Sequence, residues 1–218
     1  MSTYKLAPHF KSFNGRSGEL VLSTWKNLLI GKARPGKNKN RKVSDKQRNQ
    51  RDLFAVVSQF IFRISKSVID RAYQLGRKEN ITAYNAAMSY HMLKAVRWED
   101  SQYVLSLPEM KFSRPLLEIE NGWELDFYRD LDGRLAVKGG MNPFPDKFTQ
   151  PDDEATIIFY NTTMNRFLVY SKMRRDSLNF QLGHLKNFEG LEFFCWIFFM
   201  SADTKRVSAT KYLGMLNM

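Results

Sequence analysis

The sequence LEFFCWIFFM covers Leu191–Met200, and Glu192 is its only charged residue. It shows no alternation between apolar and polar positions, and a strand written in this way is buried on both faces. In a two-layer sandwich the outer face of a sheet meets water, so one face of this strand needs an additional cover. Two alternatives could bury this face. Either helices of the same chain pack on it, or another subunit contacts Phe194, Trp196 and Phe198.

Short β-prone runs surround this strand through the second half of the chain. Turn residues separate them, such as Asn121–Gly122 and Asp132–Gly133. Short runs with frequent turns are typical of an antiparallel sandwich. We therefore expect an Ig-like or jelly-roll-like β-sandwich, with strands at residues 103–107, 116–120, 123–129, 135–138, 156–160, 167–172, 178–182, 191–200 and 206–213.

A long helix is expected ahead of the sandwich. Ser44 and Gln47 have the spacing of a capping box, and apolar residues at helical intervals follow over 53–68. Gly76 is a typical residue just beyond a helix end. The pattern predicts one helix over residues 45–75, about 31 residues or about 46 Å long.

A second helix should run from the N-cap residue Thr82 to about Val96. His91 lies on its apolar side, where a histidine more often packs in the core than binds a ligand. Cys195 stands within the most apolar strand, which favours an inert buried thiol. The sequence contains no phosphate-binding loop and no zinc motif. We expect no metal, no cofactor and no enzymatic activity.

The first part of the chain begins with a predicted β-hairpin. Residues 19–25 and 28–30 are β-prone, and Lys26–Asn27 can form the turn between them. The whole chain is thus expected to be an α+β protein. Residues 1–98 would hold the hairpin, a basic loop and the helices, and residues 99–218 the antiparallel sandwich.

Positive charge is concentrated near the N-terminus. Residues 1–51 hold 13 lysine or arginine residues and two acids, whereas residues 52–218 hold 21 and 20. Basic arms of this kind often bind nucleic acid, and solvation or contact with a neighbouring subunit are the alternatives. The candidate contact residues are the nine cations between the hairpin and the second turn of the long helix: Lys32, Arg34, Lys37, Lys39, Arg41, Lys42, Lys46, Arg48 and Arg51.

Four acids form the second candidate surface. If Asn121–Trp123 makes a hairpin loop, the acids of the two flanking strands share one exposed face. Such a face could be solvated, could bind a hard cation or act as a glycosidase pair, or could receive the basic loop of a neighbouring copy. The residues are Glu118, Glu120, Glu124 and Asp126.

Charge and hydropathy patterns also limit the location. The 218-residue chain carries a net charge of +12, and its first residues contain no signal-peptide core. Its longest apolar run is too short to cross a bilayer as a helix. The sequence therefore predicts a soluble protein of the cytoplasm or of a virion.

A set of short motifs is scattered along most of the chain. The motifs are Gly15-x-x-Gly18, Val21, Trp25-Lys26, Arg34-Pro35, Ser44-x-x-Gln47-x-x-Gln50-Arg51-x-x-Phe54, Asn85-Ala86-Ala87 and Val207-Ser208-x-x-x-Tyr212. Together they resemble a family of uncharacterised small basic proteins found mainly in Bacteroidota. Where the family usually has Gly after Trp-Lys, this chain has Asn27. The resemblance implies the order hairpin, basic loop, long helix, shorter helix and β-domain, and it implies no activity or catalytic residue.

Three functions remain open after these observations. The first is a structural or assembly protein, for example a virion component of a phage or mobile element, whose partners are other copies of itself, other subunits, or DNA or RNA. The second is a free protein that binds nucleic acid without reading sequence. The third is a carbohydrate-active enzyme that uses the four acids.

Overall fold

The chain forms two compact units, Met1–Asp45 and Lys46–Met218. The computed structural model describes residues 2–5, 14–25, 28–34, 42–64, 66–75, 81–129, 135–181 and 190–217. The division falls at residue 45, whereas the sequence placed a boundary near residue 98. It falls there because the helices after residue 45 share one apolar core with the β-sandwich.

The first unit is an antiparallel sheet with the strand order β1-β4-β3-β2. The expected hairpin is confirmed as β3 and β4, which pair from Trp25–Leu28 to Leu20–Ala33. Its turn at Lys26–Asn27 lies outside the described residues. The strands are β1 (Ser2–Lys5), β2 (Gly15–Ser17), β3 (Leu20–Trp25) and β4 (Leu28–Ala33).

The second unit begins with three helices, α1 (Asp45–Arg63), α2 (Lys66–Ala72) and α3 (Ala83–Lys94). The predicted start at residue 45 is confirmed, and so is the cap of α3. Thr82 is its N-cap residue, and the Thr82 Oγ1 accepts a hydrogen bond from the backbone N–H of Asn85 at 3.1 Å.

The expectation of one continuous helix over residues 45–75 is wrong. The chain leaves α1 at Ile64, whose N–H donates to the carbonyl of Ile61 at 3.2 Å, three residues back. The break lets Ile64 and Ile69 both enter the same core. The buried residues are thus divided between the two helices, with Val57, Phe60 and Ile61 on α1 and Ile69 and Ala72 on α2.

After α3, most of the regular structure in the described part of the second unit consists of β-strands. A four-stranded antiparallel sheet has the order β10-β9-β12-β13, and a three-stranded sheet has the order β11-β8-β7. A hairpin of β5 (Val96–Glu99) and β6 (Gln102–Leu105) and a short 3₁₀ helix, η1 (Leu107–Glu109), precede them. The sandwich strands are β7 (Trp123–Arg129), β8 (Leu135–Gly140), β9 (Glu154–Asn161), β10 (Arg166–Arg174), β11 (Asn179–Gln181), β12 (Glu192–Met200) and β13 (Lys211–Asn217).

The connections between these strands are Ig-like. The chain changes sheet between β8 and β9, between β10 and β11, and between β11 and β12. Sheets of four and three strands joined by such crossovers are typical of constant-type Ig domains. One difference is that the fourth strand, β10, pairs with β9 in the larger sheet rather than with β11 in the smaller one. A jelly roll has eight strands, whereas the described residues of this unit place seven in the two sheets, so the Ig-like alternative fits better.

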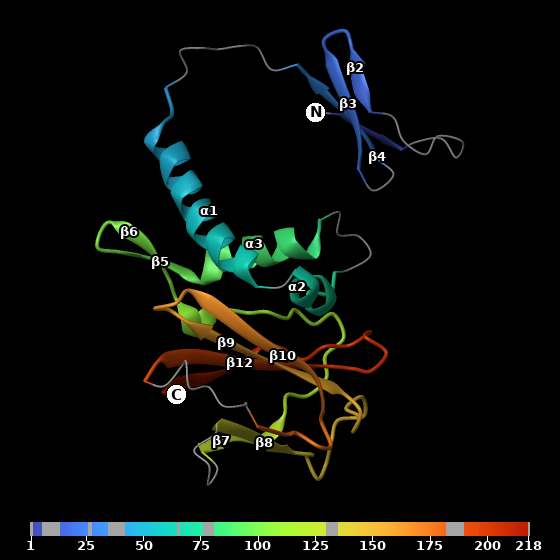
Figure 1. The fold of residues 1–218 in the computed structure, drawn as a ribbon. Helices are drawn as coiled ribbons and strands as arrows, with labels where there is room; N and C mark the ends of the chain where they lie inside the picture. The colour runs from blue at the N-terminus through green and yellow to red at the C-terminus, as the bar shows by residue number, and fades with distance from the viewer. Residues whose placement is uncertain are drawn as a thin grey trace. The chain divides into compact units, whose positions relative to one another are not determined.

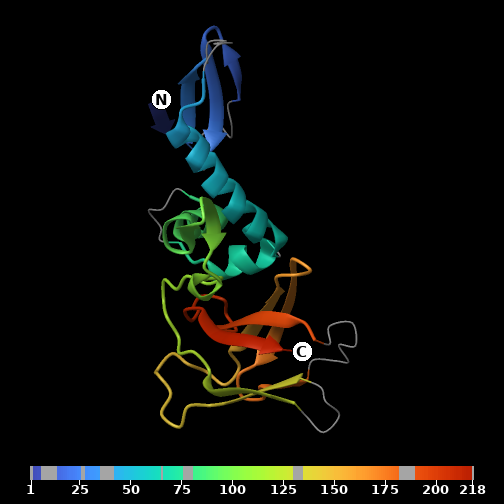
Figure 2. The same ribbon diagram turned by 90° about the vertical axis from the view of Figure 1, so that its left-hand side faces the viewer.

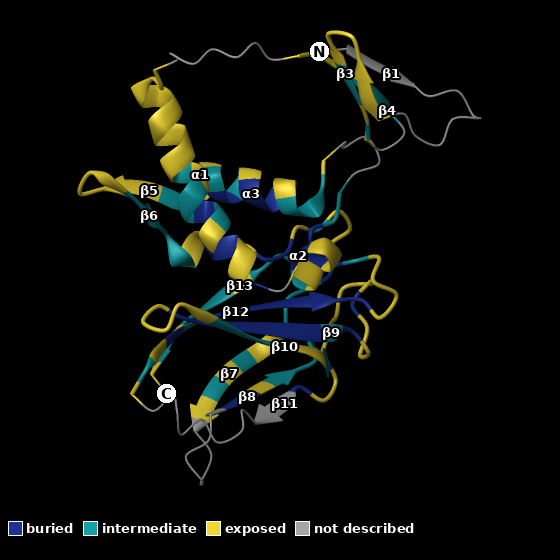
Figure 3. Ribbon diagram, turned by 45° about the horizontal axis from the view of Figure 1, so that its top comes forward, coloured by how far each residue is buried: buried dark blue, intermediate teal, exposed yellow. Residues whose placement is uncertain are grey.

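Strand β12 is covered on both faces, as its sequence predicted. One face packs with Phe159 and Val137 toward the three-stranded sheet. The other face packs against the helices, which lie over the four-stranded sheet in Figures 1 and 2. Figure 3 shows β9 and β12 as the buried centre of this unit.

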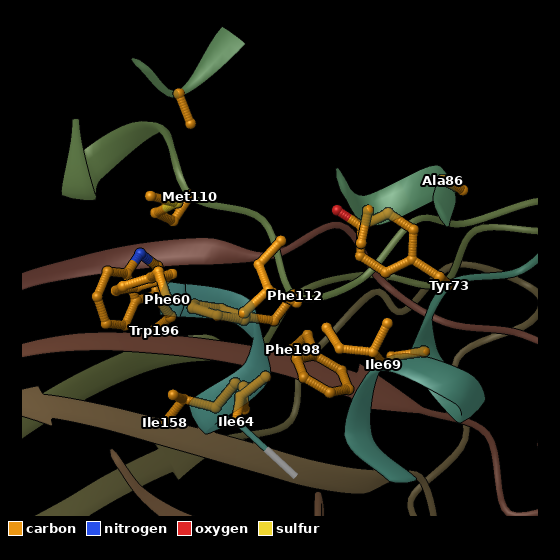
Figure 4. Close-up of a cluster of buried hydrophobic side chains, with 14 of the residues drawn as sticks. Phe60, Ile64, Ile69, Tyr73, Ala86, Met110, Phe112, Ile158, Trp196 and Phe198 are labelled. Atoms are coloured by element: carbon orange, nitrogen blue, oxygen red, sulfur yellow. The ribbon is translucent and has the colours of Figure 1, made fainter. Parts of the chain in front are cut away.

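The hypothesis of a subunit interface at Phe194, Trp196 and Phe198 is therefore corrected. Trp196 and Phe198 are buried in the core formed with the helices, and Phe194 packs at its margin, half-buried. The ring centroid of Trp196 lies 5.1 Å from that of Phe112, and Figure 4 shows both among the buried side chains of this core. The helices of the same chain supply the cover that the strand needs.

None of the helices in the described part of the chain is long and apolar enough to cross a membrane.

Candidate nucleic-acid interface

The nine candidate cations lie in residues 32–51, which we call the basic segment. Six of them are among the residues that the structure describes. Lys32 lies on β4, Arg34 follows this strand, and Lys42 precedes α1. The described cations are all exposed. Lys37, Lys39 and Arg41 lie outside the described residues. The remaining three cations, Lys46, Arg48 and Arg51, lie on α1.

The first two turns of α1 are exposed on every side. All residues over 45–52 are exposed, and burial of the helix begins only with the half-buried Leu53. Figure 3 shows this end of α1 as an exposed stretch that leads into the buried part of the unit. At 100° per residue, Arg48 and Arg51 point about 60° apart, whereas Lys46 points to another side. Cations on several sides of an exposed helix can contact a phosphate backbone in more than one orientation.

The four acids do not form the hairpin face that the sequence suggested. Residues 116–120 are not a strand paired with β7, because Glu118 instead makes an isolated bridge to Val207. Glu120 is half-buried and is engaged within its own unit: its carboxylate accepts hydrogen bonds from the Asn142 Nδ2 at 3.1 Å and from the N–H of Asp146 at 2.8 Å. This carboxylate fixes the loop after β8.

The other two acids lie on β7. Glu124 adopts a φ of +44°, where the register between β7 and β8 shifts. Asp126 lies opposite Lys138 of β8 in the pairing register. Glu118, Glu124 and Asp126 are exposed, but the internal role of Glu120 and the lysine opposite Asp126 reduce the negative charge that this surface offers to a partner.

A buried ion pair that the sequence did not indicate lies beside this region. Arg175 and Asp153 are almost inaccessible to solvent, and the Arg175 Nε donates to the Asp153 Oδ2 at 3.2 Å. The Arg175 guanidinium also donates to the carbonyl of Glu120 at 2.7 Å and stacks on the Phe199 ring at 4.1 Å. Burial raises the pKa of Asp153 and lowers that of Arg175. In each case the charge of the partner shifts the pKa in the other direction, and burial has the larger effect. The pair ties the segment before β7 to the end of β10.

His91, which is the histidine among the described residues, and Cys195 are both buried in the interior. Cys195 is fully buried in β12, and burial raises the pKa of its thiol. His91 is fully buried on α3, as expected for a packing residue. Among the described residues, no three histidine, cysteine or acidic side chains gather at a point that could hold a metal ion. His9 and His184 lie outside the described residues.

The hydrogen bonds of His91 fix the neutral ring. The Nε2 atom accepts from the N–H of Lys111 at 3.2 Å, so the proton is on Nδ1, which donates to the carbonyl of Ala87 at 2.7 Å. A protonated ring would point an N–H at the N–H of Lys111. Burial lowers the pKa of His91 to about 4.

This arrangement makes the folding free energy depend on pH. Between the unfolded pKa of about 6.5 and the folded pKa of about 4, the unfolded chain binds a proton that the folded chain does not. We expect the His91 contribution to be fully present above pH 6.5, and the free energy of unfolding to fall by about 3 kcal/mol as the pH drops to 4. Urea unfolding of the wild type and of His91→Gln across this range would measure it. Parallel pH profiles of the two proteins would contradict the assignment.

These features define an α+β protein with an Ig-like sandwich, a helical layer and an exposed basic segment. The chain belongs to the family of unknown function DUF6266, whose model matches residues 12–214. The match extends from the segment before β2 into β13, and it agrees with the resemblance to an uncharacterised family seen in the sequence. No curated protein matches the chain.

Proposed function

We propose that this chain is a non-enzymatic structural protein of an assembly, of the kind that builds phage or mobile-element particles, and that its basic segment binds the phosphate backbone of nucleic acid. Other copies of the chain or other subunits would complete the assembly. A free nucleic-acid-binding protein that uses the same segment is the alternative. The single observation that supports the proposal best is the exposed first half of α1 with its three cations.

The position of this half-helix supports a binding role. A helix placed only for packing is expected to bury a stripe along its length, and α1 does so only in its second half, at Val57, Phe60 and Ile61. The first half contains Lys46, Arg48 and Arg51 at the end of a helix where its dipole is unfavourable to cations. Phosphate groups beside Lys46 and Arg51 would offset this unfavourable interaction with the helix dipole.

Contact with acids of a neighbouring copy has less support. Glu120 is engaged within its own unit, and Asp126 has Lys138 opposite it. This leaves Glu118 and Glu124 as a small acidic surface for a segment of nine cations. A polyphosphate chain offers a larger and more regular negative charge, so nucleic acid is the partner that we favour.

Replacing Lys46, Arg48 and Arg51 together by Gln should weaken the binding of duplex DNA and reduce its dependence on salt. Gln keeps the helix propensity of these positions. Each lost phosphate contact should reduce the slope of log K against log salt by about 0.9, so that the slope falls by about 2 to 3. Fluorescence anisotropy with short labelled duplexes of unrelated sequence would measure both effects, and the loss should be alike for each sequence.

The control removes the same number of cations from the sandwich. Arg166, Lys172 and Lys211 are exposed on β10 and β13, and their replacement by Gln should leave the slope unchanged. Failure of the wild type to bind nucleic acid at low salt would overturn the proposed contact. The mass of the purified protein with and without nuclease distinguishes the assembly protein from the free nucleic-acid-binding protein. A large nuclease-resistant particle indicates assembly. A monomer that loses bound nucleic acid indicates a free binding protein.

A further inference from the structure

The pairing register of the first unit sorts the side chains of β2, β3 and β4 onto two faces of the sheet. Residues directly opposite each other in neighbouring strands share a face, and the register pairs Val21 with both Arg16 and Lys32. Successive side chains along β3 and β4 point to opposite faces, which assigns the other residues of these strands to one face or the other. One face carries Arg16, Val21, Ser23, Trp25, Leu28, Ile30 and Lys32, and the other carries Gly15, Ser17, Leu20, Leu22, Thr24, Leu29, Gly31 and Ala33.

The two faces differ completely in charge. Both cations of these three strands, Arg16 and Lys32, lie on the face of Trp25, and the opposite face has no charged residue. Arg16, Val21 and Lys32 form a row across the sheet, with the two cations on either side of the valine. Trp25 lies four residues from Val21 along β3, about 13 Å away at 3.3 Å per residue.

The Trp25 face stays in contact with water. Trp25 has 44% of its surface exposed, and Arg16 and Lys32 are exposed as well. None of the described residues between 14 and 34 is buried. An apolar cover over this face would have to bury two cations without partners, which is costly. A negatively charged ligand would instead meet both cations and leave them paired.

The aromatic ring and the cations together match one chemical class of ligand. Proteins bind single-stranded nucleic acid by stacking bases on exposed aromatic rings and by placing cations along the phosphate backbone. We propose that this face of the β2–β3–β4 sheet binds single-stranded DNA or RNA, with a base stacked on Trp25 and phosphates at Arg16 and Lys32. The inference rests on the proposed function and extends it, because the basic segment starts on this same face at Lys32.

An anionic membrane surface would also attract this face, but its apolar residues argue against that ligand. Binding to lipid scales with the apolar area that enters the bilayer. Trp25 is the one large apolar side chain among these three strands that is exposed on this face, while Val21, Leu28 and Ile30 are half-buried. A single exposed ring beside two cations fits base stacking better than insertion.

Binding of labelled oligothymidylate and oligouridylate to Trp25 variants tests the inference. Trp25→Leu should weaken single-strand binding by about 5- to 150-fold, which corresponds to the loss of one stacked base. Trp25→Phe should retain most of the affinity because it keeps a ring. Duplex binding through α1 should change little in both variants. The matched control is Trp98→Leu, since Trp98 is 58% exposed on β5 in the second unit and should have no effect.

The possible results distinguish a failure of the stacking site from a failure of the proposed nucleic-acid-binding function. Unchanged single-strand binding in Trp25→Leu, with duplex binding intact, would overturn the stacking site and leave the basic segment as the contact. Equal losses in Trp25→Phe and Trp25→Leu would indicate a damaged sheet without stacking, and would also overturn the site. Binding to vesicles of anionic phospholipid that depends on Trp25, without single-strand binding, would assign the face to membranes. A wild type that binds neither duplex nor single strand would overturn the proposed function itself.

Discussion

Replacing Asp153 by Ala is expected to destabilise the second unit by about 3–5 kcal/mol, the cost of leaving a buried partner charge uncompensated. Arg175 would keep its hydrogen bond to the carbonyl of Glu120 and its stacking on Phe199. It would lose the carboxylate that stands 3.2 Å from its Nε atom. Because neither side chain reaches solvent, water cannot replace the lost partner.

The neighbouring residues provide a control with the same chemistry. Arg174 and Asp176 form an ion pair at 2.6 Å, with 58% and 34% of their side chains exposed. Asp176→Ala should have little effect on the free energy of unfolding, because water solvates both groups. Urea unfolding followed by tryptophan fluorescence would compare the two variants.

A third variant tests the cause of the loss. Replacing the whole pair, as Asp153→Leu with Arg175→Met, should recover much of the stability that Asp153→Ala loses, since no buried charge remains. Equal stability of Asp153→Ala and Asp176→Ala would show that Arg175 finds another partner, and the role assigned to the buried pair would then be wrong.

Features with a local signal could be predicted from the sequence. The unbroken apolar run of β12 indicated burial on both faces, and the three-stranded sheet covers one face while the helices cover the other. Thr82 marked the start of α3 because its hydroxyl can satisfy a free N–H at a helix end. These conclusions depended on residues within one turn or one strand of each other.

Features set by tertiary contacts could not be predicted in this way. Residues 116–120 alternate like a strand, but Glu118 bridges to Val207, and such a long-range pairing leaves no trace in the local sequence. Arg175 and Asp153 are 22 residues apart and lie at the ends of different strands. Nothing in the spacing of an arginine and an aspartate indicates that both are buried.

The basic face around Trp25 is an intermediate case. Arg16, Trp25 and Lys32 are visible in the sequence, and two of them flank the predicted hairpin. Their common face follows only from the register, since a slip of one residue would move Trp25 to the opposite face from Lys32. The sequence could therefore indicate the cations and the ring, but the common face was recognised only from the register.

Phe60→Ala should also destabilise the second unit by about 3–5 kcal/mol, because it removes a large side chain where the helices meet the sandwich. Phe60 of α1 is buried, and its ring centroid lies 5.0 Å from those of Tyr160 on β9 and Phe167 on β10. Figure 4 shows Phe60 among the buried side chains of this core. The cavity would open between two layers, and neither layer can close it without moving relative to the other.

The same helix offers a matched control two residues further on. Phe62 is 82% exposed, so Phe62→Ala should change the free energy of unfolding by no more than about 0.5 kcal/mol. In the same urea titration, circular dichroism would follow the helices, and the fluorescence of Trp196 in variants with Phe at Trp25, Trp98 and Trp123 would follow the β12 core. Coincident transitions in Phe60→Ala would show that the helices and the sandwich unfold as one unit. If the helical signal were lost first while the β12 core stayed folded, the layer of helices would be a separate domain, and the face of β12 that carries Trp196 would need a second cover after all.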